Sequence, residues 1–147
     1  MTTPLDRLFG RLPGAWLIAR SIDDDRLGAG RFDGRATFAP QAGGALLYEE
    51  RGELRIGDWR GPAYRRWLYR RHADVLEVLY PDGGALLHRF DFAGAYSAMH
   101  THLCGEDRYE AIFTLSDTSF TIGYTVDGPA KRYRLRSDYA PAPAPAR

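Results

Sequence analysis

The sequence has little cysteine, little lysine and no long apolar run. Its 147 residues include one cysteine, so no disulfide can form within the chain. No apolar stretch approaches the roughly 20 residues that a membrane-spanning helix needs. Residues 1–14 also lack the charged-then-apolar pattern of a secretory leader. These absences predict a cytoplasmic protein without a membrane-spanning segment.

An excess of charge of one sign is also lacking. Twenty basic residues, all arginine except Lys131, are scattered among nineteen acidic residues, and the formal net charge is +1. No basic patch of the kind that binds nucleic acid or an anionic membrane surface stands out. We therefore expect neither nucleic acid nor a membrane as a partner. The length fits one domain with a core large enough to fold unaided.

Helical periodicity is confined to the N-terminus. Thr3 and Pro4 form a helix start, and the apolar residues that follow at spacings of three and four predict a short helix ending at Pro13 and Gly14. Beyond it, apolar and polar residues alternate with period two, interrupted by Gly, Pro and Asp at intervals typical of all-β sandwiches and barrels. The strands we expect are 15–23, 31–39, 45–51, 53–57, 63–72, 74–80, 85–92, 97–104, 108–115, 118–126 and 131–138.

The connections between these strands are short, as at residues 81–84 and 116–117. They predict an all-β fold: an up-and-down antiparallel β-barrel of about 8–10 strands, preceded by the short helix, whose closure removes exposed strand edges. This single domain would occupy residues 1–139. The alternating Ala and Pro of residues 140–147 predict a disordered tail.

The alternation also predicts which side chains point into the barrel, because successive residues of a strand face opposite sides. In residues 118–126, Phe120, Ile122 and Tyr124 share the inner face. In residues 85–92, Arg89 and Asp91 should face outward. The inner side chains predicted for the other strands are Phe32, Gly34, Ala36, Phe38, Leu46, Tyr48, Glu50, Trp67, Tyr69, Leu86, His88, Phe90, Phe92, Tyr109, Ala111, Phe113, Tyr133 and Leu135.

An interior that combines tyrosine hydroxyl groups, tryptophan and histidine with an apolar wall is typical of a pocket for a mostly apolar small molecule. The leading interpretation is therefore a protein that binds a small, largely apolar or aromatic molecule inside the barrel. No resident cofactor is implied, and we expect a monomer or a homodimer. The predicted ligand-binding residues are Tyr48, Trp67, Tyr69, His88, Phe90, Tyr109 and Tyr124.

Several motifs carry a resemblance to known families. Gly14-x-Trp16, directly after the helix, resembles the entry of the lipocalin and fatty-acid-binding (calycin) barrels. More specifically, the chain resembles an uncharacterised family of small bacterial proteins with a lipocalin-like barrel. The resemblance implies the fold but no activity. The matching segments are Gly14-x-Trp16, Leu47-Tyr48-x-Glu50-x-Gly52, His88-x-Phe90, His102-Leu103-Cys104-x-x-Asp107-x-Tyr109 and Gly128-Pro129-x-Lys131-x-Tyr133.

The resemblance also implies a partner for Trp16. In lipocalins an arginine of the last strand packs over the motif tryptophan, and here Arg134 or Arg136 has the right position. The alternative is that both arginines are solvated charges on the outer face of their strand.

An enzyme on the same barrel is the alternative function. Glu50 and His88 in an apolar interior would have shifted pKa values and could serve as the general acid and base of a cofactor-independent isomerase, cyclase or hydrolase. His102 is a further catalytic candidate. The competing interpretation is that Glu50 forms an ion pair with an arginine such as Arg65 or Arg89, since buried acids are normally paired.

A second alternative is a haem or metal carrier. His100 and His102 lie two residues apart on a strand and point the same way, and Cys104 continues that face. The sequence identifies no further ligand, and histidines beside a loop can simply be solvated, so we predict no metal site. Cys104 would need a cationic neighbour to act as a nucleophile and is otherwise an inert small side chain.

Overall fold

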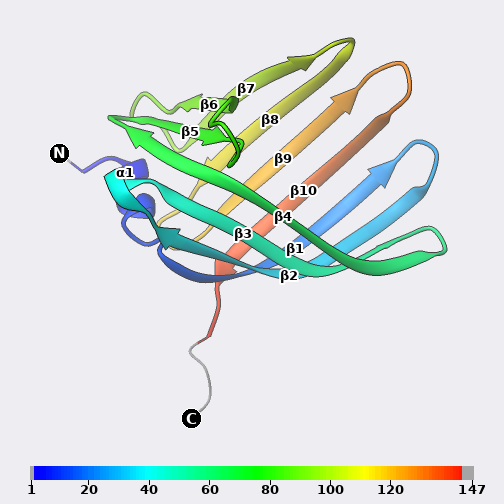
Figure 1. The fold of residues 1–147 in the computed structure, drawn as a ribbon, viewed down its shortest axis with the longest axis horizontal. Helices are drawn as coiled ribbons and strands as arrows, with labels where there is room; N and C mark the ends of the chain where they lie inside the picture. The colour runs from blue at the N-terminus through cyan, green and yellow to red at the C-terminus, as the bar shows by residue number, and fades with distance from the viewer. Residues whose placement is uncertain (1, 144–147) are drawn as a thin grey trace.

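The computed structural model describes residues 2–143 of the chain (Figure 1). Over this range the chain forms one short α-helix and ten β-strands, so the predicted all-β class is confirmed. No helix within the described range is long and apolar enough to cross a membrane. The elements are α1 Pro4–Phe9, β1 Gly14–Asp24, β2 Gly28–Pro40, a 3-10 turn at Ala42–Gly44, β3 Leu46–Ile56, β4 Trp59–His72, β5 Val75–Leu79, β6 Leu86–Asp91, β7 Ser97–Cys104, β8 Asp107–Leu115, β9 Phe120–Asp127 and β10 Arg132–Pro141.

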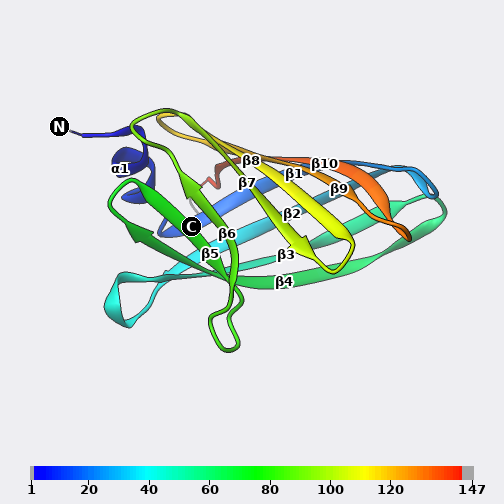
Figure 2. The same ribbon diagram turned by 90° about the horizontal axis from the view of Figure 1, so that it is seen from above.

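The ten strands form one antiparallel sheet that curls into a nearly closed barrel (Figures 1 and 2). The strand order is β6-β5-β4-β3-β2-β1-β10-β9-β8-β7, so pairing of β1 with β10 joins the two halves of the chain. The sheet ends at β6 and β7, which pack side by side but form no ladder among the described residues. We call this place the seam.

The predicted inward-facing phase is confirmed on most strands. On β9, Phe120 and Ile122 are buried and Tyr124 is half-buried, whereas Thr125 on the opposite face is exposed. On β6, Arg89 is exposed and its inward neighbours are buried. Because side chains of a strand alternate between faces, one strand face forms the core and the other forms the surface.

The predicted break between two strands at residue 52 is wrong. The segments 45–51 and 53–57 are a single strand, β3, and Gly52 continues it instead of turning it. Gly52 lies opposite Gly34 of β2, and a Cβ atom on either would collide with the ring of Phe32. Glycine is therefore needed here for close packing under an aromatic ring, not for a turn.

The inner face of β6 also differs at one position. A β-bulge between Val78 and Leu79 of β5 inserts Leu87 as an extra residue of β6. A bulge changes which side a residue faces. Leu87 is consequently buried, and Leu86, which the alternation places inside, is exposed.

The helix closes one end of the barrel, which we call the closed end (Figure 2). Thr3 and Asp6 form a capping box: the Asp6 N–H donates to Thr3 Oγ1 over 3.0 Å, and the Thr3 N–H donates to Asp6 Oδ2 over 2.8 Å. The side chains of Leu5 and Leu8, together with Leu12, are almost fully buried in the core. The helix therefore acts as an apolar plug.

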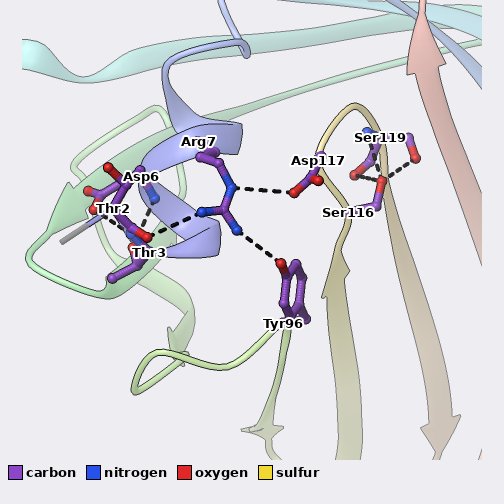
Figure 3. A network of polar contacts seen from close by, with 8 residues as sticks. All are labelled: Thr2, Thr3, Asp6, Arg7, Tyr96, Ser116, Asp117 and Ser119. Atoms are coloured by element: carbon purple, nitrogen blue, oxygen red, sulfur yellow. Dashed lines mark hydrogen bonds and ion pairs between the residues drawn. The ribbon is translucent and has the colours of Figure 1, made fainter.

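Arg7 attaches the outer side of this helix to the neighbouring loops (Figure 3). Its Nε lies 3.3 Å from Asp117 Oδ1 in the β8–β9 turn, and its Nη2 donates to the Tyr96 hydroxyl over 2.9 Å. Its Nη1 donates to the Thr2 carbonyl. These exposed contacts fix where the helix sits and contribute little stability by themselves.

Aromatic side chains fill the barrel below the helix. Phe120 stacks on Tyr139 with ring centroids 4.3 Å apart and on Phe113 at 5.3 Å, and meets Trp16 edge-on at 5.1 Å. Trp16 donates its Nε1–H to the Leu12 carbonyl over 2.9 Å. The closed end is therefore a packed aromatic core.

The implied packing of a last-strand arginine over Trp16 is not found. Arg134 and Arg136 are exposed on the outer face of β10, where Arg136 pairs with Asp138. Strand β10 itself extends through Ala140 and Pro141, the first residues of the predicted tail, and Ala142 donates to the Ala15 carbonyl. Residues 144–147 lie outside the described range.

Candidate functional site

A cavity of about 240 Å³ lies inside the barrel toward the end opposite the helix, which we call the open end. Many of its lining side chains are half-buried, and Cys104 and Tyr80 are exposed, so solvent reaches it. Strands β5 and β6 have only five and six residues, which leaves the barrel wall low beside the cavity. The residues that line this open-end cavity are Arg65, Trp67, Tyr80, Leu87, His102, Cys104, Tyr109, Tyr124, Tyr133 and Leu135.

Between this cavity and the closed end lies an inner void of about 30 Å³, large enough for roughly one or two water molecules. The two spaces share Arg65, Trp67, Leu87 and Tyr124, so they follow one another along the barrel axis. The interior therefore narrows from an aromatic cavity at the open end to the packed core at the closed end.

The inner void contains a buried polar network centred on Glu50. Arg20 donates two hydrogen bonds to its carboxylate, Nη1 to Oε2 over 2.8 Å and Nη2 to Oε1 over 2.9 Å. Tyr48 donates to Oε1 over 2.5 Å, and the Tyr48 hydroxyl lies 2.8 Å from that of Tyr139. Arg20 also donates from Nε to Ser137 Oγ over 2.6 Å. Every member has a partner, as a buried network requires.

A second arginine reaches the same carboxylate from β4. The Nε of Arg65 is 3.1 Å from Glu50 Oε2, although its N–H is not aligned for a hydrogen bond. Burial alone would raise the pKa of Glu50, but the Arg20 hydrogen bonds and the charges of Arg65 and Arg20 outweigh burial and lower this pKa to about 2. Glu50 is thus ionised at neutral pH and has little basicity.

His88 and His100 meet across the seam. His88, on β6, is fully buried, and its Nδ1 lies 2.9 Å from Nδ1 of His100 on β7, while its Nε2 has no partner among the described residues. Burial, with the neighbouring His100 and His102, lowers the pKa of His88 to about 3. His88 is therefore a neutral core side chain. Its contact with His100 connects β6 to β7 at the seam, where the two strands form no backbone ladder.

The rim of the open-end cavity carries the other polar groups of this region. His102 and Cys104 line it from β7, and the hydroxyl of Tyr109 accepts a hydrogen bond from Lys131 Nζ over 2.7 Å. Lys131 also lies 3.5 Å from Asp107 Oδ2. The charge of Lys131 is thus paired with Asp107 at the rim. The aromatic rings deeper in the cavity face its empty space.

Comparison with protein families gives a clear assignment. A family model described as a family of unknown function, DUF6314, matches residues 12–141. The chain belongs to this family. This result confirms the resemblance to an uncharacterised family that the sequence motifs indicate. Comparison with curated proteins gives no match.

Solved structures resemble this DUF6314 protein in fold. The S-type phycobiliprotein lyase CPES from Guillardia theta matches with a TM-score of 0.71 at 8% sequence identity, over 96% of this chain and 94% of that chain. A redesigned β-barrel, mFAP1, bound to DFHBI matches with a TM-score of 0.47 at 18% identity, over 90% and 98%. At these identities the similarity shows the fold alone, and the lower TM-score supports no comparison of sites.

The sequence-predicted ligand-binding residues of the DUF6314 chain separate into three places. Trp67, Tyr109 and Tyr124 line the open-end cavity. Tyr48, Tyr69 and Phe90 line only the inner void below it. His88 lines neither space, and instead packs against Phe90 and Tyr124 with ring centroids 5.4 and 5.3 Å away.

Of the predicted catalytic residues, His88 and His102 lie near one another, with ring centroids 6.1 Å apart, whereas Glu50 stands apart from both. Glu50 bonds to Arg20 and Tyr48, His88 bonds to His100, and His102 stands at the cavity rim. The pairing of Glu50 with Arg65, the competing interpretation, is present, and Arg20 is an additional partner. Glu50 thus has Arg20, Arg65 and Tyr48 as its partners, and no hydrogen bond joins it to His88.

The metal alternative lacks a complete ligand set. His100 turns its Nδ1 toward His88, whereas His102 and Cys104 face the open-end cavity or its rim. Within residues 2–143, no group of three or more histidine, cysteine, aspartate or glutamate side chains is arranged to hold a metal ion.

Some residues of the site were not predicted from the sequence. Arg20 shares the inner face of β1 with Trp16 and Ile18, so the alternation already contained the signal. Tyr139 continues the inner phase of β10 one residue beyond the predicted strand. Leu87 depends on the β5–β6 bulge, which no local pattern announces.

Proposed function

We propose that this DUF6314 protein binds a small, largely aromatic molecule in the open-end cavity. The observation that carries the proposal is the cavity itself, about 240 Å³ within a β-barrel whose opposite end is fully packed. An engineered cavity of about 150 Å³ in another protein is large enough for benzene, so this one suits a ligand of roughly one or two rings.

The wall chemistry supports an aromatic ligand. On one side of the cavity, Trp67 and Tyr80 meet edge-on with ring centroids 5.3 Å apart. On the other side, Tyr109, Tyr124 and Tyr133 line the cavity from β8, β9 and β10. Aromatic walls favour stacked or edge-on contacts with a flat ring, and tyrosine hydroxyls provide polar handles. Such a site binds by shape and ring contacts and needs no reactive side chain.

A neutral fluorescent probe tests the proposal. 6-Propionyl-2-(dimethylamino)naphthalene, a neutral dye with two fused rings, emits more strongly and at shorter wavelength in apolar surroundings, and the protein should bind it saturably with one site per chain. Leu135→Trp, which fills the cavity from β10, should abolish binding. Ile112→Trp, an equal enlargement on the exposed outer face of β8, should leave binding unchanged. Absence of saturable binding, or equal binding by the Leu135→Trp variant, would contradict the proposal.

A further inference from the structure

Arg65 is the charged side chain shared by the inner void and the open-end cavity. It lies on the inner face of β4, two residues before Trp67, and its side chain is 41% exposed. Its Nε is buried beside Glu50, whereas the side chain as a whole is partly exposed and lines the cavity. This position places a permanent positive charge beside the aromatic wall.

The charges that line the two spaces do not cancel. Among the described residues that line them, Arg20, Glu50 and Arg65 carry full charges, which leaves one positive charge in excess. The nearby phenols do not compensate, since burial raises the pKa of Tyr124 and of Tyr48. A ligand with one negative charge would neutralise the interior.

Glu50 does not require Arg65 as a hydrogen-bond donor. Its carboxylate already accepts two bonds from Arg20 and one from Tyr48. Arg65 makes only the 3.1 Å ion-pair contact through Nε, and none of its nitrogens forms a hydrogen bond with a residue in the range 2–143. Its two terminal nitrogens are thus free to donate to a group in the cavity.

We propose that the ligand of the open-end cavity is an aromatic anion, a ring of one or two cycles with a carboxylate or similar oxyanion that Arg65 binds through its terminal nitrogens. This inference rests on the proposed function. The planar guanidinium fork matches a carboxylate with two parallel hydrogen bonds, and these charge-assisted bonds are stronger than neutral ones. The competing role for Arg65 is that of a hydrated, purely structural neighbour of Glu50.

A pair of probes of nearly equal shape separates these roles. Naphthalene-2-carboxylate is anionic at pH 7, and naphthalene-2-carboxamide is its neutral analogue. Isothermal titration calorimetry should show the carboxylate binding about tenfold or more tightly than the amide. In Arg65→Gln the two should bind within about twofold of each other, with the amide affinity unchanged, and Arg65→Lys should retain part of the preference.

Arg35→Gln is the matched control, because Arg35 is exposed on the outer face of β2 and its loss changes the net charge equally. It should keep the full preference for the carboxylate. Equal binding of both probes by the unchanged protein would overturn the inference and leave the proposed function intact. A preference that survives in Arg65→Gln would remove Arg65 from the anion site. If neither probe binds at millimolar concentration, both the inference and the proposed function are contradicted.

Discussion

Phe120 and Tyr124 lie four residues apart on the same inner face of β9, yet their surroundings differ. Phe120 is enclosed by the rings of Trp16, Phe113 and Tyr139 at the closed end, whereas Tyr124 lines the open-end cavity. The same strands thus provide packing at one end and free volume at the other, with the buried network of Glu50 between them.

This difference separates the residues that hold the barrel together from those that could select a ligand. Side chains at the closed end can change only with a loss of packing. Side chains at the open end border empty space, so substitutions there can alter binding while the fold persists. The following predictions test that separation, beginning with the largest expected effect on stability.

Phe120→Ala should produce the largest loss. It removes a fully buried ring from a cluster of aromatic side chains and leaves a cavity, so the free energy of unfolding should fall by about 3–5 kcal/mol. Tyr133→Ala, a truncation beside the open-end cavity, should cost less than half as much. Urea denaturation of both variants measures the comparison, and similar losses would mean that the two ends contribute equally to stability.

Arg20→Met should be next, with a loss of about 3 kcal/mol, because it leaves the buried carboxylate of Glu50 without its bidentate partner. The effect falls at the lower end of the usual range because Arg65 remains within 3.1 Å. The double variant Arg20→Met with Glu50→Leu should recover a large part of the loss. A double-mutant cycle showing simple additivity would contradict the role given to the pair.

His88 should make stability depend on pH. Its pKa is lowered from 6.5 to about 3 in the folded protein, so only the unfolded chain takes up this proton as the pH falls below 6.5. The contribution of His88 to the free energy of unfolding is therefore fully present above pH 6.5 and is lost as the pH falls toward 3. Between pH 7 and 5 the contribution of His88 should decrease by about 2 kcal/mol.

His88→Gln should remove that part of the pH dependence, and His72→Gln, a change of the exposed histidine at the end of β4, should retain it. Denaturation curves at pH 7, 6 and 5 give the slope for each variant. The range stops at pH 5 because Glu50, with its pKa lowered to about 2, begins to contribute its own loss below about pH 4.5. An unchanged slope in His88→Gln would contradict the burial of a neutral His88.

The smallest effect on stability is expected for Arg65→Gln, less than about 1 kcal/mol. The side chain is partly exposed, and Glu50 keeps its hydrogen bonds from Arg20 and Tyr48. The melting temperature should therefore stay close to that of the unchanged protein while its selectivity between the naphthalene probes changes. A loss as large as that of Arg20→Met would show that Arg65 is mainly a structural partner.

Much of the barrel could be predicted from the sequence because alternation is a local signal. The inner phase of β9 and the burial of His88 follow from residues two apart on one strand. Glycine is a turn signal, so the sequence predicts a break between strands at Gly52, and only the facing Gly34 and the ring of Phe32 explain why the strand continues. Contacts between strands distant in sequence are not visible in a local pattern.

The candidate site was less predictable for the same reason. Arg20 and Glu50, which pair with each other, are 30 positions apart in the sequence. Tyr139, which also bonds to Arg20, comes from the last strand. Whether Tyr48 borders the ligand cavity or the inner void depends on the distance from the helix plug along the barrel, which alternation does not give. The sequence could identify an aromatic interior but not which part of it is empty.

The most direct test of the account is to locate a bound ligand by nuclear magnetic resonance. The account predicts intermolecular nuclear Overhauser effects between naphthalene-2-carboxylate and the methyl groups of Leu87 and Leu135, which line the open-end cavity. It predicts none to Leu8 in the helix plug or to Leu17 on the outer face of β1. Contacts to Leu8 or Leu17, with Leu87 and Leu135 silent, would contradict a ligand site at the open end.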